Sequence, residues 1–366
     1  MTLICDLPTP AFLVDRTIVR RNCDRMRQKA MRAGVAFRPH VKTHKTIEIG
    51  RMQHGGVVGP ITVSTLAEAE FFADHGFDDI TYAVPIAPGK LARAAALARR
   101  IRRLNVLIDS EQALRAMERS GNSFDVFLKI DCGYHRAGVD PDDPRSVALA
   151  RAISASGSAR FRGVLTHAGH SYDARNVAEI RAVAAAESDA VSRFREVVGD
   201  GSLTRSIGST PTASVVERFD GCDEVRPGNY IFYDAFQTAV GSCSLEDVAV
   251  SVLTTVVGCY PDRKTLIVDA GALALSKDLG PDHLDPHAGY GIVCDSTGGR
   301  VPLWLTALSQ EHGRVSGEPP VIATYPVGSL LRVVPNHSCL TAAMFDRYRV
   351  IEEGQVVDEW TPVRGW

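Results

Sequence analysis

Apolar and polar positions follow two alternating periods through the first two thirds of the chain. Residues 16–33 carry an apolar stripe at helical spacing that stops at Gly34, and an extended apolar segment follows at 35–41. Extended segments are then expected at 57–63, 80–84, 104–108, 126–130, 161–166, 205–207 and 224–226, with helices between them at 47–52, 66–74, 91–102, 110–118, 143–156 and 174–198. About eight strands close a (β/α)8 barrel, so the pattern predicts an α/β fold with a TIM-type barrel over residues 16–235.

The pattern changes character after residue 235. Extended segments separated by turns are expected at 248–260, 265–269, 301–308, 330–334, 348–352 and 355–360. Glu353-Gly354, between the last two, is typical of a hairpin turn. We therefore expect a second, β-sheet domain over residues 236–366, and an extended segment at 7–14 indicates that residues 1–15 join it.

Composition narrows the class of partner. The chain has 366 residues, 45% of them hydrophobic, which is enough for a large core. Its formal net charge of -2, with acids and bases interspersed, excludes the basic stripe that nucleic acid or an anionic membrane requires, so a small-molecule partner is expected. The N-terminus lacks a basic segment followed by a long apolar run, and no segment could span a bilayer, which predicts a cytoplasmic protein. The eight cysteines lack the spacing of a disulfide framework.

Basic and imidazole side chains cluster where the first predicted barrel strand ends, in residues 37–46. Active sites of TIM-type barrels gather at the C-terminal ends of the strands. A lysine held there near other cations and low-dielectric walls favours its neutral, nucleophilic form, which makes Lys42 a candidate for forming a Schiff base. The alternative is that Lys42, His44 and Lys45 form a solvated loop or a phosphate-binding patch.

The other predicted strand ends are rich in polar groups and glycine. They carry Ser64, Pro85, Asp109, residues 131–136, His167, then Gly208, Ser209 and Thr210, and finally Gly228, Asn229 and Tyr230. Loops after the seventh and eighth strands commonly hold a phosphate in these barrels, so a phosphate-bearing cofactor is predicted. The alternative is that Gly208 and Gly228 only make tight turns.

A candidate metal motif follows the extended segment at 330–334. In an extended backbone, residues two apart face the same side, so His337 and Cys339 could share one metal ion. Imidazole and thiolate suit zinc, although catalytic zinc usually has three protein ligands. The spacing alone is equally compatible with Cys339 in the core and His337 in an ordinary polar contact.

Together these motifs resemble the fold-type III pyridoxal-phosphate enzymes related to alanine racemase, and within them the D-serine dehydratase and D-threonine aldolase family, in its eukaryotic-type D-serine dehydratase branch. The resemblance covers nearly the whole chain. It rests on residues 7–10 (LPTP), 38–45 (RPHVKTHK), 63–69 (VSTLAEA), 131–133 (DCG), 136–139 (RAGV), 206–211 (SIGSTP), 227–234 (PGNYIFYD) and 337–339 (HSC).

The resemblance implies roles for individual residues. Lys42 would carry pyridoxal 5'-phosphate as a Schiff base and act as general base, Arg136 would approach the cofactor's phenolic oxygen, and Tyr172 would lie near its ring. The phosphate would be held by Gly208, Ser209, Thr210, Gly228, Asn229 and Tyr230. His337 and Cys339 would bind Zn2+, or another divalent ion such as Mn2+.

The resemblance also implies an enzymatic activity and leaves several alternative activities open. The expected enzyme is a lyase that converts D-serine to pyruvate and ammonia, and the expected assembly is a homodimer. In aldolase relatives the second metal ligand is an aspartate, so Cys339 favours dehydration over a D-threonine or D-3-hydroxyaspartate aldolase. A D-threo-3-hydroxyaspartate dehydratase shares the His-x-Cys pair and stays open, as do a racemase and a non-catalytic pyridoxal-phosphate carrier.

Overall fold

The computed structural model describes residues 2–366 and divides into two compact units. One unit comprises Asp24–Gly228 and Val363–Trp366, and the other comprises the chain up to Cys23 and Asn229–Pro362. The sequence pattern had put the boundaries at residues 15/16 and 235/236. No helix in residues 2–366 is both long and apolar enough to cross a membrane.

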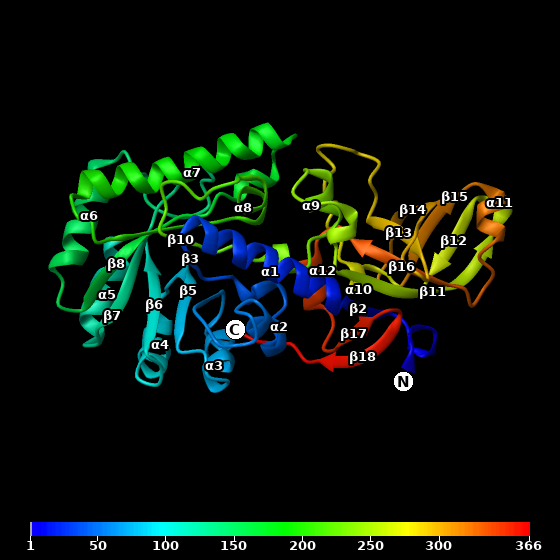
Figure 1. The fold of residues 1–366 in the computed structure, drawn as a ribbon, viewed down its shortest axis with the longest axis horizontal. Coiled ribbons are helices and arrows are strands. Elements are labelled where there is room, and N and C mark those ends of the chain that lie inside the picture. The colour runs from blue at the N-terminus through cyan, green and yellow to red at the C-terminus, as the bar shows by residue number, and fades with distance from the viewer. Residues whose placement is uncertain (1) are drawn as a thin grey trace. The chain divides into compact units, whose positions relative to one another are not determined.

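The first unit is built on an eight-stranded parallel sheet (Figure 1). Its strands are β3 (Ala36–Phe37), β4 (Ile61–Val63), β5 (Asp79–Pro85), β6 (Arg103–Ile108), β7 (Phe124–Lys129), β8 (Ala159–Leu165), β9 (Thr204–Ile207) and β10 (Glu224–Val225). Neighbours in the chain pair from β4 to β10, and β10 pairs with β3. A parallel bridge between His40 and Thr62 joins the chain after β3 to β4, so the sheet returns to its first strand. The predicted TIM-type barrel is confirmed.

Helices alternate with these strands, as the apolar spacing predicted. They are α1 (Arg16–Ala33), α2 (Ile47–Met52), α3 (Leu66–Asp74), α4 (Leu91–Ala98), α5 (Glu111–Ser120), α6 (Pro144–Ala155), α7 (Val177–Val198) and α8 (Thr210–Val215). Figure 1 shows α4 to α7 along the outside of the sheet. The long helix α7 begins where the Asn176 side chain accepts from the Glu179 N–H, and it ends at Gly199, whose φ is 79°.

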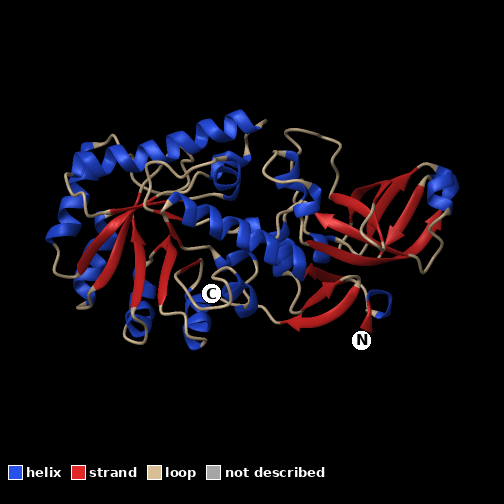
Figure 2. Ribbon diagram, viewed as in Figure 1, coloured by secondary structure: helices blue, strands red, loops and turns tan. Residues whose placement is uncertain are grey.

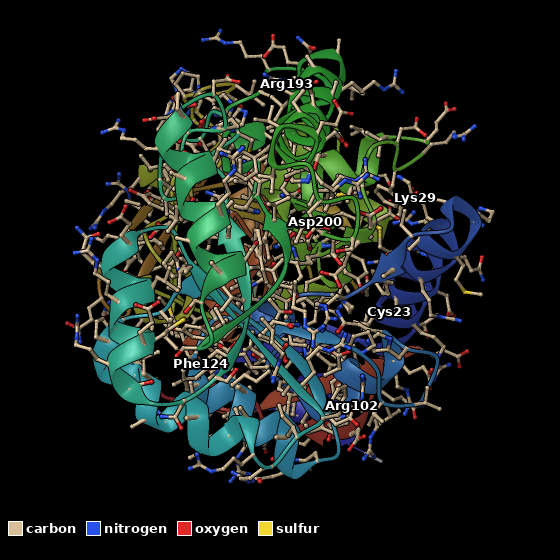
Figure 3. The ribbon with its side chains drawn as sticks, turned by 90° about the vertical axis from the view of Figure 1, so that its left-hand side faces the viewer. Cys23, Lys29, Arg102, Phe124, Arg193 and Asp200 are labelled. Carbon is tan, nitrogen blue, oxygen red and sulfur yellow. The ribbon has the colours of Figure 1, made fainter. Side chains whose placement is uncertain are left out.

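The barrel wall encloses a buried ionic network as well as apolar side chains. The Arg38 guanidinium donates to Asp79 at 2.7 Å and to Glu224 at 2.6 Å, and none of the three is more than 6% exposed. Phe124, at the start of β7, is 1% exposed, whereas Arg102 and Arg193 are exposed and pair with aspartates (Figure 3). The charges of Asp79 and Glu224 are thus compensated inside the protein.

The second unit is β-rich, as predicted (Figure 2). Its strands are β1 (Thr2–Leu3), β2 (Ala11–Asp15), β11 (Val250–Tyr260), β12 (Thr265–Val268), β13 (Gly291–Asp295), β14 (Arg300–Leu308), β15 (Gly313–Gly317), β16 (Leu330–Pro335), β17 (Tyr348–Glu352) and β18 (Gln355–Trp360), with short helices α9 (Ala235–Ala239), α10 (Ala272–Leu275), α11 (Pro319–Ala323) and α12 (Ser338–Ala343). The order β11-β12-β15-β14-β13-β16 closes on itself through a β11–β16 pairing, forming an antiparallel barrel. The expected N-terminal segment joins it, because β2 pairs with β11.

Candidate active site

Lys42 follows the first barrel strand, as predicted, but that strand, β3, ends at Phe37 and is shorter than the expected 35–41, so Lys42 lies five residues beyond it. It sits in a 3-10 turn, Val41–Thr43, and is partly buried. Its backbone N–H donates to His40 Nδ1 at 3.4 Å, and His40 Nε2 lies 3.4 Å from the Ser64 hydroxyl at the end of β4. The strand ends therefore bring together Lys42, His40 and Ser64.

Positive charge accumulates around this strand end. Burial, and then the charges of Lys42 and Arg226, hold the pKa of His40 well below its usual value. Burial, Lys42 and Lys129 do the same to the pKa of His167. Burial and the charge of Arg226 lower the pKa of Lys129 to about 7. Such a cluster suits an anionic ligand, because negative charge would relieve the repulsion among the cations.

The loop after β9 has the features of a phosphate cradle. Gly208 has a φ of 136°, and a Cβ there would come within 2.7 Å of the Arg226 backbone nitrogen. The Ser209 hydroxyl accepts the Thr212 N–H and so caps the N-terminus of α8. The Thr210 hydroxyl oxygen is buried without a hydrogen-bond partner in residues 2–366. A buried hydroxyl of this kind costs free energy unless a ligand binds it, so the residues present fit a bound phosphate.

Gly228 also permits a close approach, since a Cβ there would lie 3.1 Å from the Cβ of His40. The neighbouring Asn229 and Tyr230 are buried. The Asn229 amide nitrogen lies within hydrogen-bonding distance of Asp234 at 2.9 Å, the Ser338 hydroxyl at 2.8 Å and Cys339 Sγ at 3.5 Å, three acceptors that share its two hydrogens. Asn229 thus contacts the residues of the metal motif, and its role toward a phosphate stays a prediction.

Arg136 and Tyr172 occupy loops at the ends of β7 and β8. Arg136 is exposed, with its guanidinium 4.9 Å from the centre of the Tyr134 ring. Tyr172 ends a 3-10 turn, Gly169–Tyr172, and is partly buried. Arg136 lies in the loop after β7, where it was expected, and Tyr172 lies in the loop after β8; their contacts with a cofactor stay predictions.

The metal motif has a different backbone from the one expected. The strand β16 ends at Pro335, and Ser338 begins α12, so the reasoning from an extended backbone is wrong. The buried Asp234 carboxylate accepts the Ser338 N–H at 3.0 Å and so stabilises the first turn of α12. The His337 and Cys339 side chains nevertheless meet in a hydrogen bond.

His337 has the surroundings of a metal-binding imidazole. Its Nδ1 lies 3.2 Å from Asp278 Oδ2. Burial opposes its charged form, but hydrogen bonds to Asp278 and Cys339 raise the pKa of His337 well above its usual value. A carboxylate on one ring nitrogen is the usual way to orient a metal-ligating histidine. No group of three or more His, Cys, Asp or Glu side chains in residues 2–366 is arranged to hold a metal ion, and metal binding by His337 and Cys339 stays a prediction.

Comparisons with known proteins agree with both units. Residues 14–235 match the family model "Alanine racemase, N-terminal domain", and residues 249–351 match "Putative serine dehydratase domain". D-serine dehydratase from Dictyostelium discoideum is 41% identical over 99% of this chain and 98% of its own. The chain belongs to the D-serine dehydratase family of alanine racemase-like proteins. D-threo-3-hydroxyaspartate dehydratase from Delftia sp. HT23 is 39% identical, covers 100% of both chains and superimposes with a TM-score of 0.95.

Alanine racemases of much lower sequence identity share the fold of this chain. Alanine racemase from Clostridium difficile is 12% identical with a TM-score of 0.67, which shows a shared fold alone. The alanine racemase-like fold family depends on pyridoxal phosphate.

Several candidate residues were missed from sequence. Lys129, Glu187 and Arg226 are buried, yet they stand in stretches that also carry exposed charges. Their burial becomes evident only in the folded structure. His44, which was open from sequence, accepts the Thr46 N–H through Nδ1 at 3.1 Å, and burial lowers its pKa to about 3. It therefore stabilises the chain locally as an uncharged side chain.

Proposed function

We propose that this protein is a pyridoxal-phosphate-dependent D-serine dehydratase, a lyase that converts D-serine to pyruvate and ammonia. The observation that carries the proposal is the 41% identity to a D-serine dehydratase over 99% of this chain. The cationic strand ends around Lys42 and the His337–Cys339 contact support it.

The proposed cofactor residues in the barrel unit are Lys42 for covalent attachment, Arg136 and Tyr172 beside the ring, and Gly208, Ser209, Thr210 and Gly228 for the phosphate. Asn229 and Tyr230 follow these directly in the chain. The chemistry supplied when bound is electron withdrawal from the substrate Cα by pyridoxal phosphate and Lewis acidity toward the β-hydroxyl by Zn2+ or another divalent ion such as Mn2+.

Side chains of this protein would act as the general base and as the ligands of the metal ion. Lys42 is the proposed general base, and its side-chain amine would take up the proton from the substrate Cα. His337 and Cys339 would hold the metal ion. Asp278 already engages His337 Nδ1, which leaves Nε2 for the metal and fixes the ring.

Product identity tests this function directly. The purified protein would be incubated with D-serine, L-serine, D-threonine or D-3-hydroxyaspartate, with and without a chelator, and every product identified by mass. Pyruvate and ammonia from D-serine, lost with the chelator, are expected. Glycine with an aldehyde would identify an aldolase, and L-serine formed from D-serine would identify a racemase. Absence of turnover with bound cofactor would identify a carrier.

A second candidate is D-threo-3-hydroxyaspartate dehydratase. The Delftia enzyme of that name is 40% identical over 98% of this chain, and the structure with that name superimposes closely. Comparing kcat/KM for the two substrates separates these functions, because the natural substrate should give the higher value. D-serine would give pyruvate, and D-threo-3-hydroxyaspartate would give oxaloacetate.

The family likeness also supports proposals about organisation. Residues 16–235 would form the cofactor-binding barrel, and 236–366 with 1–15 the metal-binding domain. The enzyme would act in the cytoplasm as a homodimer. Light scattering of the purified protein tests the assembly, because a monomeric mass would contradict it.

A further inference from the structure

A carboxylate outside the predicted site connects two loops at the carboxyl end of the barrel. Glu187 lies in the middle of α7 and is 0% exposed. Its Oε1 accepts the Ala168 N–H at 3.0 Å and the Gly208 N–H at 3.1 Å. These residues follow β8 and β9, so one carboxylate oxygen holds the backbones of two neighbouring loops.

The second oxygen of Glu187 reaches the first turn of α8. Oε2 accepts from the Thr212 hydroxyl at 3.2 Å. Because a carboxylate only accepts, the Thr212 proton is directed toward Glu187, and the Thr212 oxygen is left to accept the Ser209 N–H at 3.3 Å.

The remaining links close a ring of hydrogen bonds. The Ser209 hydroxyl lies 2.8 Å from that of Ser171, and Ser171 donates to the Ala168 carbonyl at 2.7 Å. Ala168 in turn donates to Glu187. Ser171, Ser209, Thr212 and Glu187 are each no more than 3% exposed. Ser171 precedes Tyr172, so the ring connects the predicted phosphate cradle to the turn that carries Tyr172.

The cradle borders a hollow of about 700 Å³ between α7 and α8, and Glu187, Gly208 and Thr212 are among the residues that line it. The N–H groups of Gly208 and Ser209 have acceptors within the protein, whereas the buried Thr210 hydroxyl oxygen has no hydrogen-bond partner in residues 2–366.

We propose that Glu187 is a positioning residue that sets the shape of the phosphate cradle and so determines affinity for the phosphate of the cofactor. This inference rests on the proposed pyridoxal-phosphate function. Glu187 itself touches neither the cofactor nor the substrate in this account. Its effect runs through Gly208, Thr212 and Ser209.

The test compares two ligands that differ only in the phosphate. Apoprotein would be titrated with pyridoxal 5'-phosphate and with pyridoxal, following absorbance. Glu187→Met keeps the side-chain length and removes both acceptors, which we expect to weaken pyridoxal phosphate at least about tenfold while pyridoxal changes less than about threefold. Thr212→Val, which removes one link, should give a smaller loss of the same kind and remains informative if Glu187→Met fails to fold.

Two further variants separate positioning from general stability. Glu187→Gln keeps one acceptor oxygen and can donate to Thr212. It should therefore keep the preference for the phosphorylated ligand that Glu187→Met loses. Asp79→Asn alters another buried carboxylate, at the start of β5, and should leave the ratio of the two affinities unchanged.

The outcomes distinguish the two claims. If the wild-type protein binds neither ligand, the proposed function fails. If it prefers pyridoxal phosphate and Glu187→Met keeps that preference, the function stands and the positioning role is overturned. Equal weakening of both ligands by Glu187→Met would also overturn it, since that result indicates a structural role only.

Discussion

Gly208 offers a quantitative test of the cradle's geometry. In a Gly208→Ala variant the new Cβ would meet the Arg226 backbone nitrogen at 2.7 Å, at a φ of 136°. The φ alone costs an alanine about 1–3 kcal/mol, and relieving an overlap with backbone adds about 1–3 kcal/mol. We therefore expect the free energy of unfolding to fall by about 2–6 kcal/mol, with a loss of affinity for pyridoxal phosphate.

Gly199 is the matched control, because its φ is 79° but nothing lies within 4 Å of a Cβ placed there. Gly199→Ala should cost about 1–2 kcal/mol and leave cofactor affinity unchanged. Urea unfolding of both apoproteins measures the difference. The close-approach argument is refuted if Gly208→Ala is no less stable than Gly199→Ala.

The remaining predictions concern charged and metal-binding groups. Since the folded pKa of Lys129 is lowered to about 7 from 10.5, the folded protein is penalised below pH 7 and gains stability as pH rises toward 10.5. Lys129→Met should therefore stabilise the apoprotein by at most about 5 kcal/mol near pH 7, with a gain that shrinks toward pH 10, and a pH-independent gain in urea unfolding would contradict this. Lys42→Ala should abolish the absorbance of the covalently bound cofactor and all turnover, which spectra and product assays measure together. His337→Ala and Cys339→Ala should keep that absorbance and lose both bound metal and dehydration, and normal turnover of D-serine by either variant would remove the metal's role as leaving-group activator.

The barrel was predictable from sequence because several of its strands contain short apolar runs, as in β4 and β5, that alternate with helices. The antiparallel barrel was predicted less completely. Strands β13 and β15 were missed, since Gly291, Gly313 and Gly317 dilute their apolar pattern. The turn at 353–354 was predicted and is confirmed by φ values of 48° and 77°.

The site shows a similar division between local and tertiary information. Lys42 could be placed because it follows a recognisable strand. The contact between His337 and Cys339 was expected from an extended backbone, and that reasoning was wrong. The segment is helical from Ser338, whose N–H donates to Asp234, about a hundred residues earlier in the chain. Glu187 could not be predicted, since its partners come from two segments, around residue 168 and at 208–212, that only the folded barrel brings together.

The central claim is that Lys42 carries the cofactor covalently. Borohydride reduction of the protein loaded with pyridoxal phosphate makes such a bond permanent, and peptide mass mapping locates it. The account predicts one phosphopyridoxyl group on the peptide that contains Lys42. An adduct on a different peptide, such as the one that contains the buried Lys129, or no adduct at all, would contradict it.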